Sequence, residues 1–178
     1  MTESMMIRPA VREDLPELMA LFSEARATIA ALGIDQWQNG YPNEEIVSED
    51  IDDQRSYAAR KDNALCGSFV LMEREPLYDR IEDGAWLTGD RTSGYLAIHR
   101  VAVAVACRGQ GISTAILNFA EEEAKARGLT SLRIDTHKGN VVMRRMLEKH
   151  GFSLCGVIHL ANGDPRVAYE RRIGEAVR

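Results

Sequence analysis

The sequence predicts an α+β fold in which a mixed sheet of about seven strands is flanked by about four helices. The central observation is the valine-rich apolar run Tyr95–Val105, which is typical of a strand buried on both faces. An amphipathic helical pattern follows at Gly109–Arg127, and a second strand pattern follows at Ser131–Thr136. A strand, a helix and a strand in this order form a right-handed crossover, so these two strands are expected to be parallel. The other neighbouring strands form hairpin-like pairs, so the sheet is expected to be mixed.

The region before residue 95 alternates short strand and helix patterns. Asp14 is expected to cap the first helix, because Leu15-Pro16 and Glu17 follow it. The expected elements are a strand at Met5–Arg8 ending at Pro9, a helix from Asp14 to Gly33, a loop at Gly33–Pro42, a helix from Asn43 to Asp53, and strands at Tyr57–Lys61 and Ala64–Glu73. The stretch Arg74–Gly94 is interpreted as a long connection, and such connections are usually functional or mobile.

The last elements are marked by glycine and asparagine. Gly128 ends the long helix at a position that favours a left-handed cap. Asn140 caps a final helix that Gly151 stops. Strand patterns at Leu154–Leu160 and Arg166–Arg171 flank the turn residues Asn162-Gly163-Asp164 and predict a hairpin. Because no repeat or linker appears, residues 1–178 are expected to form a single domain.

Composition narrows the classes of function. The net charge of −5 and the lack of a basic block argue against nucleic-acid binding. The first residues lack the pattern of a secretory signal, and the longest apolar run, Val101–Cys107, is too short to cross a bilayer. The three cysteines, Cys66, Cys107 and Cys155, are odd in number and lack metal-ligand spacing. We therefore expect a cytoplasmic protein without a membrane partner, whose cysteines are reduced.

The most informative segment is the turn Arg108-Gly109-Gln110-Gly111-Ile112-Ser113, between the valine strand and the long helix. The start of a helix has unpaired backbone N–H groups and a positive dipole charge. Two glycines remove the side chains that would keep a pyrophosphate from these groups, and Arg108 can add a charge-assisted hydrogen bond. The alternative is a tight turn that needs glycine only for its geometry. The combination of strand, turn and helix favours anion binding.

Two other phosphate-binding loops fit this turn less well. A P-loop requires a lysine followed by serine or threonine after its second glycine, whereas Gly111 is followed by Ile112-Ser113. A dinucleotide-binding loop requires a third glycine and an acidic residue about twenty positions later. Asp135 lies at about that distance, but the third glycine is missing.

The turn resembles the Arg/Gln-x-x-Gly-x-Gly/Ala signature of the GCN5-related N-acetyltransferase (GNAT) family. The segment from Asn140 through Leu147 to Gly151-Phe152 is similar to that family's Asn-x-x-Ala-x-x-Leu-Tyr-x-x-x-Gly-Phe helix. The predicted element order is also the family's order, so the resemblance covers nearly the whole chain. The segments Gly33–Gln38 and Arg133–His137 look like those of an uncharacterised bacterial subgroup, which leaves the acceptor unnamed.

The resemblance implies acetyl-CoA as co-substrate and a set of residues that bind it. The backbone groups of Val101 and Val103 would pair with the pantetheine arm as a further strand would. The amides of the turn, Arg108, Gly109, Gln110, Gly111, Ile112 and Ser113, would hold the pyrophosphate. Asn140 would bond the pantetheine, although its role as a helix cap alone also explains it. Many relatives have a tyrosine that protonates the leaving thiolate, and Leu147 occupies that position here.

The candidate bases are His137, Asp135 and His99. Asp135 and His137 lie near the carboxyl end of a predicted strand, where open α/β sites cluster, and His99 lies on the neighbouring strand. A histidine titrates in the useful pH range. The alternative is that Asp135 pairs with an arginine, Arg133 or Arg100, and that His137 is an ordinary loop residue.

Four aromatic residues, Trp37, Tyr41, Trp86 and Tyr95, are candidates for lining the acceptor pocket. They would otherwise fill the core or a homodimer contact. Four histidines without paired spacing make a metal site unexpected.

The predicted function is an acetyl-CoA-dependent N-acetyltransferase that acts on a primary amine of a small acceptor by direct attack in a ternary complex. The alternatives are a non-catalytic acyl-CoA-binding module, which Leu147 keeps open, and a peptide or protein N-terminal acetyltransferase.

Overall fold

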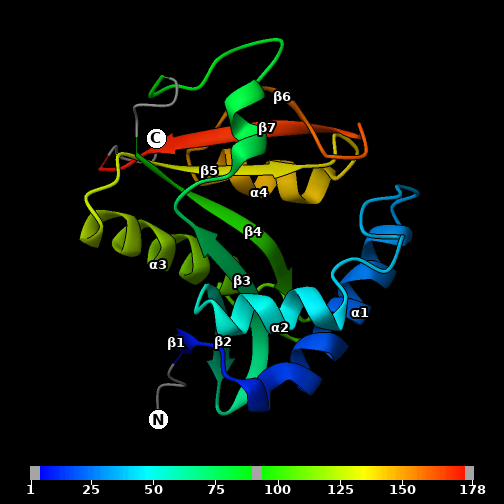
Figure 1. The fold of residues 1–178 in the computed structure, drawn as a ribbon. Coiled ribbons are helices and arrows are strands. Elements are labelled where there is room, and N and C mark those ends of the chain that lie inside the picture. Colours follow the sequence, from blue (N-terminus) through cyan, green and yellow to red (C-terminus); the bar gives the residue numbers. More distant parts are fainter. Residues whose placement is uncertain (1–4, 90–93, 175–178) are drawn as a thin grey trace. The chain divides into compact units, whose positions relative to one another are not determined.

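The computed structural model describes residues 5–89 and 94–174, and its strands and helices follow the predicted order (Figure 1). Its strands are β1 (Met5–Pro9), β2 (Ser56–Lys61), β3 (Ala64–Met72), β4 (Tyr95–Val103), β5 (Ser131–Thr136), β6 (Ser153–His159) and β7 (Pro165–Arg172). Its α-helices are α1 (Leu15–Ala30), α2 (Glu44–Asp52), α3 (Ile112–Ala126) and α4 (Val141–Lys149), and 3₁₀ turns lie at η1 (Arg12–Asp14), η2 (Pro76–Arg80) and η3 (Val105–Cys107).

The strands form a seven-stranded sheet in the order β1-β2-β3-β4-β5-β7-β6. Strands β4 and β5 are parallel, with Tyr95 opposite Ser131 and Ala97 opposite Arg133. The pairs β1–β2, β2–β3, β5–β7 and β6–β7 are antiparallel. The mixed sheet and the parallel crossover are therefore confirmed.

Two boundaries beside the glycine turn differ from the prediction, and Asp14 stands at the predicted cap position without making a capping bond. Helix α3 begins at Ile112 rather than Gly109, because Gly109 and Gly111 have φ values of +73° and +78°, which a right-handed helix does not allow. Strand β4 ends at Val103, and the next residues form η3. Asp14 precedes α1 without a side-chain capping bond, because its carboxylate accepts from Arg8, Arg60 and the Val11 amide instead.

The long connection expected at Arg74–Gly94 is partly ordered by the short turn η2. Residues 90–93 of this connection lie outside the described residues. The other end signals are confirmed. Gly128 has a φ of +68°, Asn140 Oδ1 accepts from the Met143 amide at 3.2 Å, and the Phe152 amide donates to Leu147 O at 3.0 Å after Gly151.

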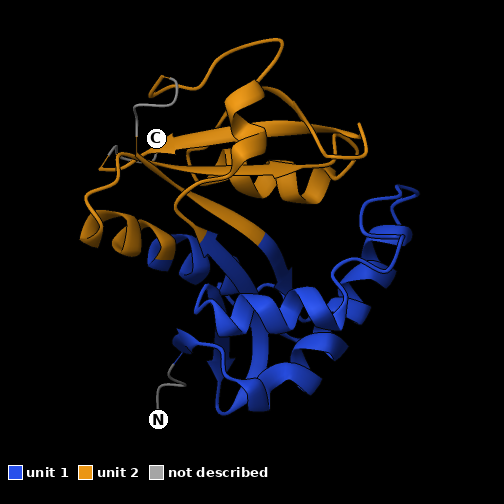
Figure 2. Ribbon diagram, viewed as in Figure 1, with its two compact units in different colours: residues 1–71, 100–119 blue, residues 72–99, 120–178 orange. Residues whose placement is uncertain are grey.

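The chain divides into two compact units, coloured separately in Figure 2. Unit 1 comprises Met1–Leu71 and Arg100–Phe119, and unit 2 comprises Met72–His99 and Ala120–Arg178. That the whole chain is one domain stays a prediction.

Unit 1 has an apolar layer on each face of its strands. On one face, α1 and α2 pack on Ala58 and Ala102 through a core that includes Leu18, Phe22, Val47 and Ile51. On the other face, Tyr57 stacks on Phe69 at 5.2 Å, and Phe119 of α3 packs 5.1 Å from Tyr57. Tyr57 and Ala58 are adjacent, and adjacent strand residues point to opposite faces, so these strands are covered on both sides.

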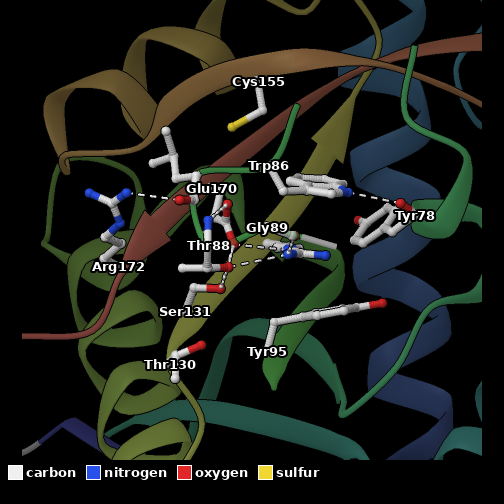
Figure 3. Close-up of polar contacts among 12 residues, drawn as sticks. Tyr78, Trp86, Thr88, Gly89, Tyr95, Thr130, Ser131, Cys155, Glu170 and Arg172 are labelled. Carbon is white, nitrogen blue, oxygen red and sulfur yellow. Dashed lines mark hydrogen bonds and ion pairs between the residues drawn. The ribbon is translucent and has the colours of Figure 1, made fainter. Parts of the chain in front are cut away.

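Unit 2 is also covered on both faces. Tyr169 points to α4, where its hydroxyl contacts Arg144 at 3.0 Å and Glu148 at 3.1 Å. The next residue, Glu170, points to the opposite face and bonds Thr88 of the long connection. Figure 3 shows Thr88, Ser131 and Glu170 joined there by hydrogen bonds.

The core of unit 2 contains a buried ion pair. Arg133 Nε lies 2.9 Å from Glu170 Oε1, and the two side chains are 2% and 0% exposed. The guanidinium also lies between the rings of Trp86 and Tyr95, 4.3 and 4.1 Å from their centroids. Burial works against ionisation of Glu170, but hydrogen bonds from Ser131, Thr88 and Arg133 lower its pKa below the ordinary value.

The expectation of reduced cysteines was wrong for two of the three. Cys66 and Cys107 form a disulfide in unit 1, with Cα atoms 5.6 Å apart, and Cys155 is free and buried. The two are 41 residues apart in sequence. The Ala104 amide donates to Cys66 O at 2.9 Å, which brings the end of β4 beside β3 and makes the pairing geometrically available.

In residues 5–89 and 94–174, no helix is long and apolar enough to span a membrane. The same residues contain no group of three or more His, Cys, Asp or Glu side chains that could hold a metal ion.

We predict that Glu170→Gln lowers the free energy of unfolding by about 3–5 kcal/mol, because it leaves the buried Arg133 charge uncompensated. Urea denaturation measures the change. The matched control is Glu122→Gln, whose exposed partner is Lys125, and little change is expected there. Equal stabilities of the wild type and Glu170→Gln would show that the ion pair is not needed.

We also predict that Asp14 makes stability depend on pH in the acid range. The hydrogen bond from Arg8, followed by those from Val11 and Arg60, lowers the Asp14 pKa well below its ordinary value, against the effect of burial. The stabilisation is present above the unfolded pKa of about 4 and is lost as the pH falls. Asp14→Asn should flatten the stability profile from about pH 5 to pH 2, whereas Asp62→Asn in an exposed turn should not. A profile unchanged by Asp14→Asn would contradict this account.

Candidate active site

The turn before α3 is open to solvent. Arg108, Gly109, Gln110 and Gly111 are exposed. A Cβ atom built on Gly109 or Gly111 would meet nothing within 4 Å. Their positive φ values, rather than close packing, therefore explain why glycine stands at both positions.

Four backbone amides of this turn have no protein acceptor among the described residues: those of Gly109, Gly111, Ile112 and Ser113. The other two are used within the chain, because Arg108 N donates to Val105 O at 3.3 Å and Gln110 N donates to Cys107 O at 3.4 Å. The four remaining amides lie at the N-terminus of a 15-residue helix, where the helix dipole adds positive potential. This arrangement can hold an anion.

Helix α1 supports the turn from inside unit 1. Glu24 Oε2 accepts from the Val105 amide at 2.8 Å, and Arg108 Nη2 donates to Thr28 Oγ1 at 3.2 Å. On β3, Gly67 leaves room for Ile112, whose Cγ2 lies 3.0 Å from the place of a Cβ. The turn is thus supported by contacts with α1 and β3.

Strand β4 changes conformation at Arg100, which has a φ of +50°. The Arg100 guanidinium is anchored by Asp50, with Nε–Oδ2 and Nη2–Oδ1 distances of 2.7 Å, and Asp50 is 2% exposed. Beyond this point the Ala104 amide faces β3, where it bonds Cys66 O. Because backbone groups alternate along a strand, those of Val101 and Val103 face away from β3.

Two of the three candidate bases come together in unit 2. The hydroxyl of Tyr78 donates to Asp135 Oδ1 at 2.7 Å, and the Tyr78 ring lies 5.8 Å from the His99 ring. Burial raises the pKa of Asp135, and the nearby Glu75 charge adds to the rise, whereas the Tyr78 hydrogen bond and Arg166 lower it. Burial also raises the pKa of Tyr78 well above its ordinary value. His99 Nε2 lies 3.4 Å from Glu75 Oε2.

The third candidate, His137, follows the end of β5 and has a different environment. Its Nδ1 accepts from the Gly139 amide at 3.0 Å, so the ring organises the loop before α4. Neither arginine considered as a partner of Asp135 pairs with it, because Arg133 pairs with Glu170 and Arg100 pairs with Asp50.

The four aromatic candidates fall into two groups. Trp86 and Tyr95 are 6% and 5% exposed and enclose the Arg133 guanidinium, which favours the core role considered as their alternative. Trp37 and Tyr41 are half-buried in unit 1, where Trp37 packs edge-on against Phe22 and the Tyr41 hydroxyl bonds Arg100. A cavity of 320 Å³ in unit 1 is lined by none of the four, but by Glu17, Ala20, Leu21, Glu24, Leu65 and Ala104.

Two residues at the last helix, Asn140 and Leu147, were singled out by the resemblance to the acetyltransferase family. Asn140 caps α4, which agrees with the helix-cap role considered for it. Leu147, which stands where many relatives have tyrosine, is 0% exposed. An apolar side chain is therefore accommodated in the core at this position.

Sequence reasoning missed Glu75 and Tyr78, which lie beside His99 and Asp135. Both belong to the long connection, where no periodicity marks a buried face. The Glu75-Pro76 pair does carry a local signal, because a carboxylate followed by proline is typical of a helix start. Glu75 Oε1 indeed accepts from the Leu77 amide at 3.1 Å.

The sequence profile of the acetyltransferase (GNAT) family matches residues 16–152. A GNAT-family acetyltransferase structure from Streptococcus agalactiae is 34% identical, with 97% of this chain and 96% of that chain covered and a TM-score of 0.85.

Two curated relatives match over shorter segments. An acetyltransferase from Agrobacterium fabrum is 36% identical over 48% of this chain and 62% of its own length. A streptothricin acetyltransferase from Escherichia coli is 27% identical over 64% of this chain and 56% of its own length. The profile match and the full-length structural similarity show that the chain belongs to the GNAT family of acetyltransferases and is an enzyme of that class.

Proposed function

We propose that the enzyme transfers the acetyl group of acetyl-CoA to a primary amine of a small acceptor, by direct attack of the amine in a ternary complex. The supporting observation is the exposed turn at which the amides of Gly109, Gly111, Ile112 and Ser113 lack an acceptor within residues 5–89 and 94–174. A diphosphate offers several acceptor oxygens and a charge that the helix dipole favours. The residues present therefore fit this group.

Bound acetyl-CoA would supply an activated acetyl thioester. In the proposal, the turn holds the pyrophosphate, and the backbone of Val101 and Val103 pairs with the pantetheine arm. The Val103 N–H stabilises the oxyanion. Asn140 contacts the pantetheine beside its role as a cap. With Leu147 at the usual tyrosine position, the thiolate leaves without that proton donor, which the modest basicity of a thiol permits (pKa about 8.5).

The amine must lose a proton before it attacks. We propose His99 as the base that takes it, because a neutral imidazole is available near pH 7 and a carboxylate lies 3.4 Å from its Nε2. Asp135 and His137 are the other candidates, and Asp135 already accepts from Tyr78.

The small acceptor is supported by one relative, whose name gives streptothricin as its substrate. The test is release of free CoA in the presence of a panel of small amines and of peptides with free N-termini. Turnover with small amines is expected. Tight binding without turnover would support a non-catalytic module, and turnover of peptides alone would support an N-terminal acetyltransferase.

We predict that Gly111→Glu weakens CoA binding at least a hundredfold, because a carboxylate would stand among the amides and repel the diphosphate. Isothermal titration calorimetry measures the affinity. Gly128→Glu is the matched control, since Gly128 lies at the opposite end of α3, has a φ of +68° and has nothing within 4 Å. Both changes strain the backbone similarly, so equal affinities of the two variants would rule out the turn as the binding site.

We predict that His99→Gln lowers kcat by about 10²–10⁴-fold with little change in CoA affinity, as expected for loss of a general base. Asp135→Asn and His137→Ala are measured in parallel, and His159→Gln, at an exposed position on β6, serves as the control. A larger loss of kcat in either parallel variant than in His99→Gln would transfer the role of base to that residue.

A further inference from the structure

Glu75 makes three hydrogen bonds and one contact with His99 around η2 and β4. The Tyr95 hydroxyl accepts from the Glu75 amide at 2.9 Å and donates to Glu75 O at 3.1 Å. Within the side chain, Oε1 accepts from the Leu77 amide at 3.1 Å. The remaining carboxylate oxygen, Oε2, lies 3.4 Å from His99 Nε2, and the His99 and Glu75 side chains are only 15% and 17% exposed.

We propose that Glu75 is a positioning residue for acetyl transfer, whose carboxylate faces Nε2 of His99 at 3.4 Å and stabilises the imidazolium. A neutral imidazole with its proton on Nε2 has its lone pair on Nδ1. The proton of the acceptor's ammonium group moves to Nδ1, so that an N–H bond breaks at the acceptor and forms at His99. The positive charge that appears on the ring then faces the Glu75 carboxylate. The inference rests on the function proposed above.

The groups around His99 favour Glu75 over Asp135 for this role. In unit 2, His99 contacts Glu75 at 3.4 Å and the Tyr78 ring at 5.8 Å. Two further titratable groups bond these neighbours: Asp135 bonds Tyr78, and Tyr95 bonds the backbone of Glu75. Asp135 Oδ1 accepts a hydrogen bond from Tyr78, whose ring lies 5.8 Å from the His99 ring. Among the described residues, Glu75 places a carboxylate oxygen 3.4 Å from the imidazole.

A second pair of the same type provides a built-in comparison. Glu82 Oε2 lies 3.7 Å from His159 Nδ1, but those side chains are 64% and 43% exposed. Water screens charges at an exposed pair, so removal of the Glu82 charge should affect His159 only slightly. The pair of Glu75 and His99 is mostly shielded from water and should respond more strongly.

The experiment compares Glu75→Gln with Glu82→Gln. Glutamine keeps the length of the side chain and an oxygen for the Leu77 amide, and the backbone bonds to Tyr95 do not involve the side chain, so the fold should persist. The first readout needs no co-substrate: it is the pH titration of the His99 and His159 ring protons by NMR in the free enzyme. In Glu75→Gln, the His99 midpoint should move to lower pH by about one unit.

The second readout is the pH dependence of kcat. Glu75→Gln should lower the plateau of kcat about tenfold and move its acid limb to lower pH, because the base becomes weaker. The KM for acetyl-CoA should not change. Glu82→Gln should change neither the His99 midpoint nor kcat.

An unchanged His99 midpoint and acid limb in Glu75→Gln would overturn the positioning role, even if kcat fell through a structural effect. Failure of the proposed function gives a different result, because the wild type would then turn over no amine while the NMR shift in Glu75→Gln could still be measured.

Discussion

The proposed co-substrate site depends on one constraint of backbone conformation. Gly109 and Gly111 adopt left-handed φ values, so the chain cannot enter α3 until Ile112. Several amides near the helix start are consequently left without acceptors in the part of the chain that the structure describes, at a point where the helix dipole is positive. Neighbouring contacts support the backbone just before the turn. The Glu24 carboxylate accepts a hydrogen bond from the Val105 amide, and a disulfide joins Cys107 to Cys66 of β3. A site made from backbone amides needs the correct conformation more than a particular side chain.

In unit 2, a buried ion pair organises the residues proposed for proton transfer. Arg133 and Glu170 fix the long connection through Thr88 and Gly89, and the rings of Trp86 and Tyr95 enclose the guanidinium. Figure 3 shows how the Trp86 indole then reaches the carbonyl of Tyr78. Tyr95 links the ion pair to Glu75, because its ring contacts Arg133 while its hydroxyl bonds the backbone of Glu75. The stability of unit 2 and the position of Glu75 are thus coupled through one tyrosine.

The sequence predicted what periodicity and end signals determine. The valine run, the amphipathic α3 and the cap at Asn140 produced the element order, the parallel pair and the mixed sheet, all of which are confirmed. The glycine turn also predicted the candidate anion site from the sequence alone. Prediction failed where partners are distant in sequence. The Cys66–Cys107 disulfide, the Asp50–Arg100 pair and the Arg133–Glu170 pair depend on which strands and helices become neighbours. Glu75 and Tyr78 were missed because an irregular connection carries no pattern that reports which side chains it buries.

The most direct test of the account is an NMR titration of the ¹⁵N-labelled enzyme with CoA, in which the backbone amide signals are followed individually. The amides of Gly109, Gly111, Ile112 and Ser113 should show the largest downfield proton shifts, because each gains a charged acceptor, and the Gln110 amide, which already donates to Cys107 O, should shift less. Saturable binding that leaves these four signals unmoved would contradict the central claim, because the diphosphate would then lie elsewhere.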